Sequence, residues 1–382
     1  MTLDRIAEKV RAGERLDIED GVVLFTTKDL LRVGVLANEV RERMHGDRTY
    51  FNRNMHINTT NVCYASCMFC SFARLEEGKP GAYTMSLDEA WGRLRAQDGN
   101  FLSEIHIVNG LHTGLPFDYY EELLRGLKRI RPEIHLKCFT AVEIHFFAEK
   151  FGMSYRQVLE RLRAAGLDSL PGGGAEIFAA RYRKKVCADK VDAEGWLQVH
   201  REWHRMGGKS NATMLYGMIE TPEERADHLL RLRALQDETG GLQTFIPLAF
   251  HNEGNPLRKL PEPTGFDNLR VYAASRLLLD NVPHIKAYWI MVGEKIAQVA
   301  QSFGVDDVDG TVLEERIYHM AGAETPQGLT RKELVRLIKD AGRVPVERDT
   351  LYNVIWEEGQ SVPERYSGVG ANAGAIHLPV AS

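Results

Sequence analysis

The sequence predicts an α/β fold, specifically a parallel β/α (TIM-like) barrel with N-terminal helices and a C-terminal extension. Strand-like and helical runs alternate along the chain, and no G-x-G-x-x-G, the fingerprint of the open dinucleotide-binding fold, follows the first strand. In the second strand, Glu104 and His106 alternate with Ile105 and Ile107. A parallel sheet covered on both faces is nearly all apolar. A polar face therefore indicates a barrel with a water-accessible lumen that holds a substrate. The alternative is that these residues lie at the rim of an ordinary sheet.

The elements follow in order. Residues 1–50 are expected to be helical, because Leu3, Ile6 and Val10 form an apolar stripe and a Thr26-x-x-Asp29 cap precedes a second apolar run. Strands are expected at 55–60, 104–109, 133–139, 167–170, 211–216, 242–250 and 285–292, and helices at 86–96, 117–130, 155–165, 195–206, 222–238 and 267–279. The barrel is therefore placed at 51–343. Residues 344–382 lose periodicity and are expected to form a wrapping extension.

Composition narrows the class of protein. The 382 residues include 48 basic and 53 acidic side chains without a block of like charge, which argues against nucleic-acid binding and a polybasic membrane anchor. No apolar run is long enough to cross a membrane, and the N-terminus does not resemble a signal peptide. Five cysteines are too few, and odd in number, for a secreted disulfide framework. These features predict a cytoplasmic enzyme with a small-molecule substrate, no nucleic acid and no membrane.

Three cysteines lie in one short segment after the first predicted strand: Cys63, Cys67 and Cys70, in a C-x3-C-x2-C spacing. A structural zinc would need a fourth ligand, and Cys138 and Cys187 lie far away in sequence, where isolated cysteines are usually small buried apolar groups. Three thiolates without a fourth suit a 4Fe–4S cluster with one open iron. A zinc site and a redox dithiol are the alternatives.

This spacing, with an aromatic residue before the last cysteine, resembles the radical S-adenosylmethionine (SAM) superfamily. Further runs resemble the branch that contains the menaquinone futalosine-pathway enzymes and the deazaflavin synthases, over about residues 50–350. Within it, the Pro-Gly-Gly-Gly-Ala-Glu run at 171–176 and the Thr-Met-Leu-Tyr-Gly run at 213–217 look most like the aminofutalosine synthase family.

The resemblance implies a radical-SAM barrel with a 4Fe–4S cluster, SAM as co-substrate, and a one-electron reductant of flavodoxin or ferredoxin type. It implies a transferase-type reaction in menaquinone biosynthesis. There the 5′-deoxyadenosyl radical adds to 3-[(1-carboxyvinyl)oxy]benzoate, and the products are 6-amino-6-deoxyfutalosine, bicarbonate and methionine. The alternatives are a hydrogen-abstracting sister enzyme (cyclic dehypoxanthinylfutalosine synthase or a deazaflavin synthase subunit) and a non-catalytic iron–sulfur or zinc-binding protein.

The resemblance also implies roles for individual residues. The cluster ligands would be Cys63, Cys67 and Cys70, and the SAM-binding residues would be Phe69, Asn109, Gly110, Thr140, Glu143 and Glu176. Phe69 is expected under the adenine, and Glu176 is expected to accept the ribose hydroxyls. Asn109 departs from the Gly-Gly that is common at its position. Gly110 is alternatively a plain turn glycine, and Glu176 a helix N-terminal carboxylate.

Candidates for substrate binding come from the strands. His56 and His106 are expected to face the lumen, although a structural role is the commoner outcome for a histidine in a strand. Lys286 is a candidate clamp for a substrate carboxylate, with Arg276 and Arg348 as alternatives. The acidic run Asp306, Asp307 and Asp309 lacks the spacing of an EF-hand, so a capping and turn role is expected.

Overall fold

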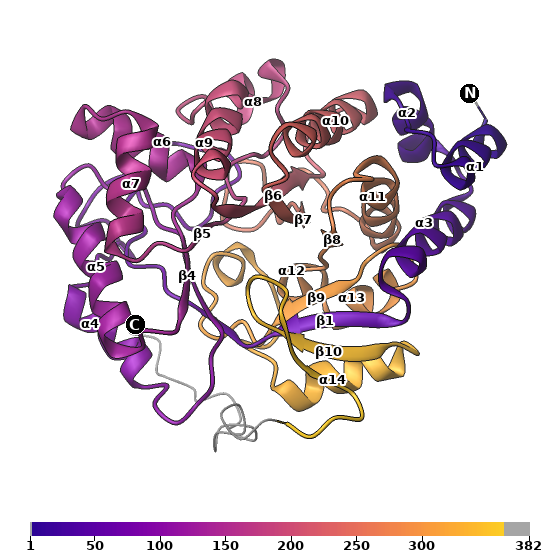
Figure 1. The fold of residues 1–382 in the computed structure, drawn as a ribbon. Helices are drawn as coiled ribbons and strands as arrows, with labels where there is room; N and C mark the ends of the chain where they lie inside the picture. The colour runs from indigo at the N-terminus through magenta and orange to yellow at the C-terminus, as the bar shows by residue number, and fades with distance from the viewer. Residues whose placement is uncertain (1, 363–382) are drawn as a thin grey trace.

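The computed structural model describes residues 2–362. Its main sheet has seven parallel strands in the order β2-β3-β4-β5-β6-β7-β8, so every neighbour in the sheet is also the next strand in the sequence (Figure 1). The strands are β2 (Asn54–His56), β3 (Glu104–Ile107), β4 (His135–Cys138), β5 (Ser169–Leu170), β6 (Lys209–Tyr216), β7 (Leu242–Ala249) and β8 (His284–Ile285). This order and direction confirm the predicted parallel β/α architecture.

Segment 307–313 links the two edges of this curved sheet. At the β8 edge the Ala287 N–H donates to the Asp307 carbonyl (2.8 Å), and at the β2 edge the His56 N–H donates to the Leu313 carbonyl (2.8 Å). The sheet is therefore an incomplete barrel whose gap is bridged by this segment, and its lumen is enclosed.

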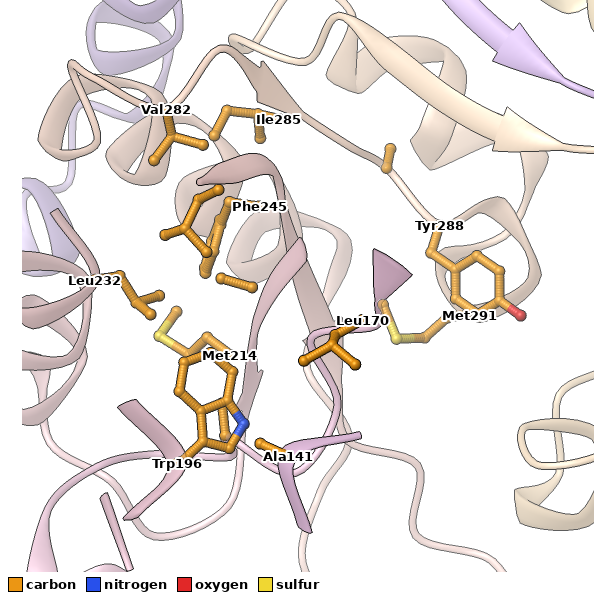
Figure 2. Close-up of a cluster of buried hydrophobic side chains, with 14 of the residues drawn as sticks. Ala141, Leu170, Trp196, Met214, Leu232, Phe245, Val282, Ile285, Tyr288 and Met291 are labelled. Carbon is orange, nitrogen blue, oxygen red and sulfur yellow. The ribbon is translucent and has the colours of Figure 1, made fainter. Parts of the chain in front are cut away.

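Helices cover the outside of the sheet: α4 (Leu87–Arg95), α5 (Phe117–Ile130), α6 (Ala141–Phe151), α7 (Tyr155–Ala165), α8 (Ala180–Val186), α9 (Ala193–Arg205), α10 (Pro222–Thr239) and α11 (Gly265–Leu278). Capping boxes start five of them, at Ser86, Thr140, Ser154, Thr221 and Thr264. Between sheet and helices lies the apolar core, in which Trp196, Met214, Phe245 and Ile285 are all fully buried (Figure 2).

The N-terminal helices are α1 (Leu3–Ala12), α2 (Ile18–Thr26) and α3 (Leu30–His45), as the sequence predicted. The expected cap differs: Thr26 ends α2, and Asp29 caps α3 by accepting from the Arg32 N–H. They pack beside α10 and α11 at one side of the ring in Figure 1. Their apolar faces are buried there, and Ile6, Leu24 and Val33 are completely inaccessible. Within residues 2–362, none of the helices combines the length and hydropathy that a membrane span requires.

A second sheet, absent from the sequence prediction, has the order β11-β10-β1-β9. It joins β1 (Arg48–Asn52), β9 (Asp307–Gly310), β10 (Val344–Arg348) and β11 (Val354–Glu357), and β1 runs parallel to β10. Helices α12 (Trp289–Val292), α13 (Glu294–Ala300) and α14 (Arg331–Asp340) and the 3-10 turn η1 (His319–Ala321) complete this part.

Two expectations need correction. The segment after residue 343 is not simply a wrapping extension, since β10 pairs with β1 across the expected boundary at residue 50, and β11 pairs with β10. Residues 363–382 lie outside the described part. The last expected strand, 285–292, ends after Ile285, and its final residues form α12 instead. A short apolar run can be buried either as a strand or as a helix, so hydrophobicity alone did not distinguish the two.

Candidate active site

The three clustered cysteines lie on the loop that follows β2. Cys63 and Cys67 are buried and Cys70 is partly exposed. Backbone hydrogen bonds fix the loop: the Cys63 N–H donates to the Arg74 carbonyl (2.9 Å), and the Met68 N–H donates to the carbonyl of Val186 (2.9 Å), the last residue of α8. The loop is therefore held at two points, by its own C-terminal part and by the end of α8.

The sulfur atoms lie in a buried environment that also contains hydrogen-bond donors. Burial raises the pKa of the Cys67 thiol to about 12 and also raises that of Cys63, and each thiol lies within electrostatic range of Cys70. Backbone N–H groups of Ala65 and Leu111 oppose the effect at Cys63, and the Ala73 N–H donates to Cys70 Sγ (3.4 Å). Thiols of high pKa lose their protons when they bind a metal, so the donor set fits an iron–sulfur cluster.

The two remaining cysteines differ from each other. Cys138 is fully buried in β4, as expected for a structural cysteine. Cys187, expected to lie far from the cluster segment, follows α8 directly and is within electrostatic range of Cys67. The reason is the backbone contact between Met68 and Val186, which joins the two segments. No spacing in the sequence could have revealed that contact.

Glu176 and Phe69 meet at a lysine that the sequence analysis missed. Lys190 Nζ lies 2.6 Å from Glu176 Oε1 and 5.1 Å from the centroid of the Phe69 ring. Glu176 itself is 4% exposed and has a left-handed backbone with φ of 47°. The geometry thus places the expected ribose-binding carboxylate beside the expected adenine-binding ring, with Lys190 between them.

The glycines before Glu176 are required by packing. A Cβ on Gly172 would lie 2.6 Å from the Ala212 backbone in β6, and one on Gly174 would lie 2.2 Å from Val142 Cγ2 in α6. Gly174 also has φ of 85°, which favours glycine. These glycines allow the loop that leads to Glu176 to pass between β6 and α6.

Asn109 and Gly110 fasten the end of β3 to the cysteine loop. Asn109 Oδ1 accepts hydrogen bonds from Thr59 N–H (2.7 Å) and Thr59 Oγ1 (2.9 Å). A Cβ on Gly110 would lie 2.3 Å from the Val62 carbonyl oxygen, next to Cys63. Gly110 is therefore more than a plain turn glycine, because its missing side chain makes room for the backbone that carries the first cysteine.

Thr140 and Glu143 form the capping box of α6. Glu143 Oε2 accepts from the Thr140 N–H (2.7 Å) and Oγ1 (2.9 Å), and Glu143 Oε1 accepts from the Asn109 N–H (3.0 Å). Burial raises the pKa of Glu143 to about 7, although these hydrogen bonds oppose the rise. The two residues thus hold the end of β3, and both carboxylate oxygens of Glu143 already accept hydrogen bonds from the protein.

The lumen contains a cavity of about 200 Å³. His56, His106 and Lys286 all line it, together with Tyr288, Glu315 and Tyr318, which the sequence analysis did not single out. The rings of His56 and His106 are 4.5 Å apart, and burial lowers the pKa of both, so both are neutral at physiological pH. His106 Nδ1 is buried and has no hydrogen-bond partner within residues 2–362, which leaves it free for a bound ligand.

Both cavity lysines already face carboxylates. Lys137 Nζ lies 2.7 Å from Glu104 Oε2, and both side chains are buried. Lys286 Nζ lies 3.4 Å from Asp309 Oδ1. Two lysines and three carboxylates, the third being Glu315, therefore line the cavity, and a bound anion would have to compete with these carboxylates.

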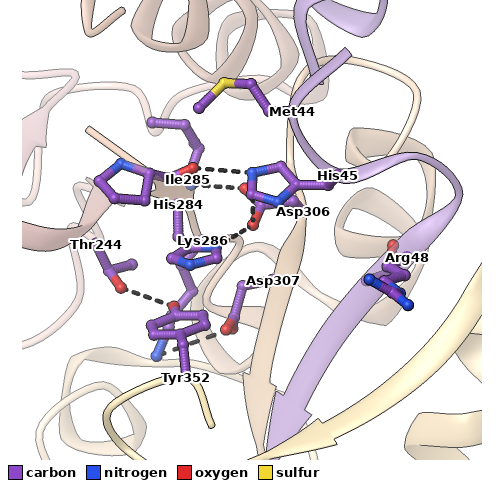
Figure 3. A network of polar contacts seen from close by, with 12 residues as sticks. Met44, His45, Arg48, Thr244, His284, Ile285, Lys286, Asp306, Asp307 and Tyr352 are labelled. Carbon is purple, nitrogen blue, oxygen red and sulfur yellow. Dashed lines mark hydrogen bonds and ion pairs between the residues drawn. The ribbon is translucent and has the colours of Figure 1, made fainter. Parts of the chain in front are cut away.

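The alternative clamps lie outside the cavity lining. Arg276 pairs with Asp306, and Arg348 Nη2 lies 2.6 Å from Asp307 Oδ2 (Figure 3 shows both aspartates). Asp306 also accepts from His284 Nδ1 (2.5 Å). The expected turn role holds for Asp307, whose Oδ1 accepts from the Asp309 N–H (2.7 Å). The expected helix-capping role is wrong: Asp306 and Asp307 form buried ion pairs at the start of β9, with partners distant in sequence.

Comparison with protein families agrees with this arrangement. Residues 57–232 match the radical SAM superfamily, and residues 239–360 match the CofH/MqnC C-terminal region. The chain belongs to the radical SAM superfamily. It is 54% identical to an aminodeoxyfutalosine synthase of Thermus thermophilus, over 92% of this chain and 95% of the relative. It is 48% identical to an aminodeoxyfutalosine synthase of Streptomyces coelicolor, over 95% and 96% of the two chains.

More distant relatives share the overall architecture. A 5-amino-6-(D-ribitylamino)uracil–L-tyrosine 4-hydroxyphenyl transferase of Methanoculleus marisnigri is 37% identical, over 92% of this chain and 98% of the relative. Among solved structures, the hydrogenase maturase HydG from Carboxydothermus hydrogenoformans has a TM-score of 0.70 at 17% identity, covering 91% and 80% of the two chains. Methylornithine synthase has a TM-score of 0.69 at 17% identity, covering 89% and 97%. These two structures support the fold alone.

Proposed function

We propose that this radical SAM enzyme is an aminodeoxyfutalosine synthase of menaquinone biosynthesis. It would join the 5′-deoxyadenosyl group of SAM to 3-[(1-carboxyvinyl)oxy]benzoate and, with uptake of one water molecule, give 6-amino-6-deoxyfutalosine, bicarbonate and methionine. The observation that carries the proposal is the 54% and 48% identity, over nearly the whole chain, to two enzymes of that name. The hydroxyphenyl transferase, at 37%, is more distant.

Cys63, Cys67 and Cys70 would hold a 4Fe–4S cluster, which when bound supplies the electron that cleaves the sulfonium of SAM. The chain's own part is to hold the sulfurs: the backbone N–H groups that hydrogen-bond Cys63 and Cys70 stabilise their thiolate forms. Burial of Cys63 and Cys67 limits the access of water to these two sulfur atoms. Cytoplasmic location and a flavodoxin- or ferredoxin-type reductant complete the proposal.

SAM would lie between the cysteine loop and the ends of β3 and β5. Glu176 would accept the ribose hydroxyls, and Phe69 would contact the adenine; their common neighbour Lys190 supports this placement. The backbone at Asn109 and Gly110 would approach the methionine end. Thr140 and Glu143 would act by positioning that backbone, because their side chains already bond each other and Asn109.

The benzoate substrate would occupy the lumen cavity. The unpartnered His106 Nδ1 supports a hydrogen bond to it, with the adjacent His56 ring packed against His106. Lys286 would bind a substrate carboxylate, which would then partly replace Asp309 as the partner of the Lys286 ammonium group. Tyr288 and Tyr318 provide apolar walls for an aromatic ring at the same cavity.

The test compares candidate substrates. The anaerobically reconstituted protein is incubated with SAM, dithionite and one of three additions: 3-[(1-carboxyvinyl)oxy]benzoate, dehypoxanthinylfutalosine, or tyrosine with 5-amino-6-(D-ribitylamino)uracil. Mass spectrometry then identifies the products. We expect a new product only with the first. A product from either of the other two additions, and none from the first, would show that the protein has a sister activity instead. A protein that binds zinc in place of iron would refute the proposal that it is a radical SAM enzyme.

A further inference from the structure

The side chains that line the lumen cavity lie in layers along its axis. Three charged side chains, which we call the cavity floor, form one end: Glu104, Lys137 and Lys286. His106 follows Glu104 by two residues on the same face of β3, so it lies roughly 6–7 Å further along the strand. The His56 ring lies 4.5 Å from the His106 ring. An aromatic layer therefore follows the cavity floor in the direction of the strands.

Two tyrosine rings continue this aromatic layer away from the floor. The Tyr288 ring is stacked with the His56 ring, with the centroids 6.3 Å apart and an angle of 10° between the planes. The Tyr318 ring meets the Tyr288 ring edge to face, with the centroids 5.6 Å apart. Both tyrosines line the cavity. The row of rings thus leads from the cavity floor to Tyr318 at the other end.

Tyr318 also lies close to the expected SAM site. Its side chain is within electrostatic range of Glu176, the carboxylate that we assign to the ribose hydroxyls. It belongs to the segment that follows β9 and directly precedes η1. Tyr318 is therefore a cavity residue at the end where the ribose and the substrate would meet.

The carboxylate of Glu315 fixes the backbone of Tyr318. Glu315 Oε1 accepts from the N–H groups of Ile317 (2.7 Å) and Tyr318 (3.1 Å), and its Oε2 lies 3.1 Å from His319 Nδ1. The hydrogen bond to Glu315 raises the pKa of His319, which favours a cationic imidazole beside that carboxylate. Glu315 is thus largely compensated by protein groups, and it holds the segment that carries the tyrosine.

The hydroxyl group of Tyr318 is available to a ligand. It forms no hydrogen bond within residues 2–362, although the residue lines the cavity. Burial raises the pKa of the phenol well above its ordinary value, so the group keeps its proton and can donate at neutral pH. An oxygen atom of a bound molecule would supply the missing acceptor.

We propose that Tyr318 positions the carboxyvinyl end of the substrate, by donating a hydrogen bond to the carboxylate at that end. The inference rests on the proposed function, in which the vinyl carbon must approach the 5′ carbon beside the ribose. The ring carboxylate then points to Lys286 on the cavity floor, and the benzene ring lies along His56 and Tyr288. In this orientation the two carboxylates meet different donors at opposite ends of the cavity.

The experiment removes the hydroxyl group and, separately, the carboxylate that it would bind. Tyr318→Phe is compared with the wild type and with the matched control Tyr272→Phe, whose buried hydroxyl in α11 also has no hydrogen-bond partner within residues 2–362. The reconstituted enzymes, with SAM but no reductant, are titrated with 3-[(1-carboxyvinyl)oxy]benzoate and with 3-(vinyloxy)benzoate, which lacks the carboxylate on the vinyl group. We expect Tyr318→Phe to raise the Kd of the first ligand about tenfold or more, the factor for a hydrogen bond to a charged group. The Kd of the second ligand should not change, and the control should bind both ligands as the wild type does.

Turnover gives a second readout that a merely structural role would not move. With reductant present, Tyr318→Phe should release more free 5′-deoxyadenosine per product formed than the wild type, because the vinyl carbon is held less firmly. Equal losses of affinity for both ligands, or unchanged affinity and unchanged partition, would overturn the proposal. If Tyr318→Phe proves less stable, the two-ligand comparison still decides, since a packing defect weakens both ligands alike. A wild type that converts none of the substrate would refute the proposed function itself, whereas an active wild type with an unaffected Tyr318→Phe would refute only the role of Tyr318.

Discussion

Replacing Gly110 by alanine should damage the cysteine loop more than it damages the fold. The new Cβ would lie 2.3 Å from the Val62 carbonyl oxygen and 2.8 Å from the Val62 carbonyl carbon. To restore even a 3.0 Å contact, the Val62 peptide must retreat, and it leads directly into Cys63. Overpacking of this kind costs about 1–3 kcal/mol of folding free energy. Because Cys63 moves with the displaced peptide, we expect the cluster site to be disrupted.

The assay measures iron and sulfide per chain after anaerobic reconstitution, together with thermal unfolding of the unreconstituted protein. Gly110→Ala should fold but hold substantially less iron than the wild type. Gly92→Ala in α4 is the matched control, since a Cβ there meets nothing within 4 Å and helix propensity favours alanine by up to about 1 kcal/mol. A Gly110→Ala protein with full iron content would refute the reasoning, because the loop would then tolerate the displacement.

Three further predictions concern the cysteines, the ribose contact and acid stability. Alanine at Cys63, Cys67 or Cys70 should abolish iron retention. The Cys138→Ala and Cys187→Ala variants should retain iron and lose about 1–2 kcal/mol of packing energy. Loss of iron in either of these two variants would show that the ligand set is wrong. Glu176→Gln should keep its iron and bind SAM about 1.5–3 kcal/mol more weakly in a calorimetric titration, and unchanged affinity would leave Glu176 a structural role. Burial lowers the pKa of His135 and His204 to about 4 and of His228 to about 3. The unfolded chain therefore binds more protons below pH 6.5, and the free energy of unfolding in urea should fall from about pH 6.5 to 4, by about 1.4 kcal/mol for each unit by which a pKa is lowered. His228→Gln should flatten that slope, and a stability that does not change over this range would contradict the prediction.

Local patterns in the sequence predicted the barrel and the residues that face its lumen. The alternation at 104–107 placed Glu104 and His106 on one face, and both line the cavity, while Ile105 and Ile107 are fully buried. Period-two alternation and capping boxes are properties of neighbouring residues, so one sequence suffices to read them. The same holds for the three cysteines, whose ligand geometry needs only one loop.

Contacts between distant segments could not be predicted in this way. The pairing of β1 with β10 joins residues about three hundred positions apart, and the approach of Lys190 to Glu176 depends on how α8 packs on the cysteine loop. Nothing in the composition around Lys190 distinguishes it from the nearby Lys184 and Lys185. The buried ion pairs of Asp306 and Asp307 were missed for the same reason, because their partners Arg276 and Arg348 lie on other elements.

The most direct test of the central claim follows the 5′ carbon of SAM. The reconstituted enzyme is given SAM labelled with carbon-13 at that position, a reductant and 3-[(1-carboxyvinyl)oxy]benzoate, and the label is located by mass spectrometry. An enzyme that adds the adenosyl group must keep the label in its product, and the lumen must then hold the vinyl carbon within about 3–3.5 Å of the 5′ carbon. We predict labelled 6-amino-6-deoxyfutalosine as the main product, with only minor free 5′-deoxyadenosine. Stoichiometric 5′-deoxyadenosine that carries deuterium from a labelled substrate, with no carbon-13 in the product, would contradict the account.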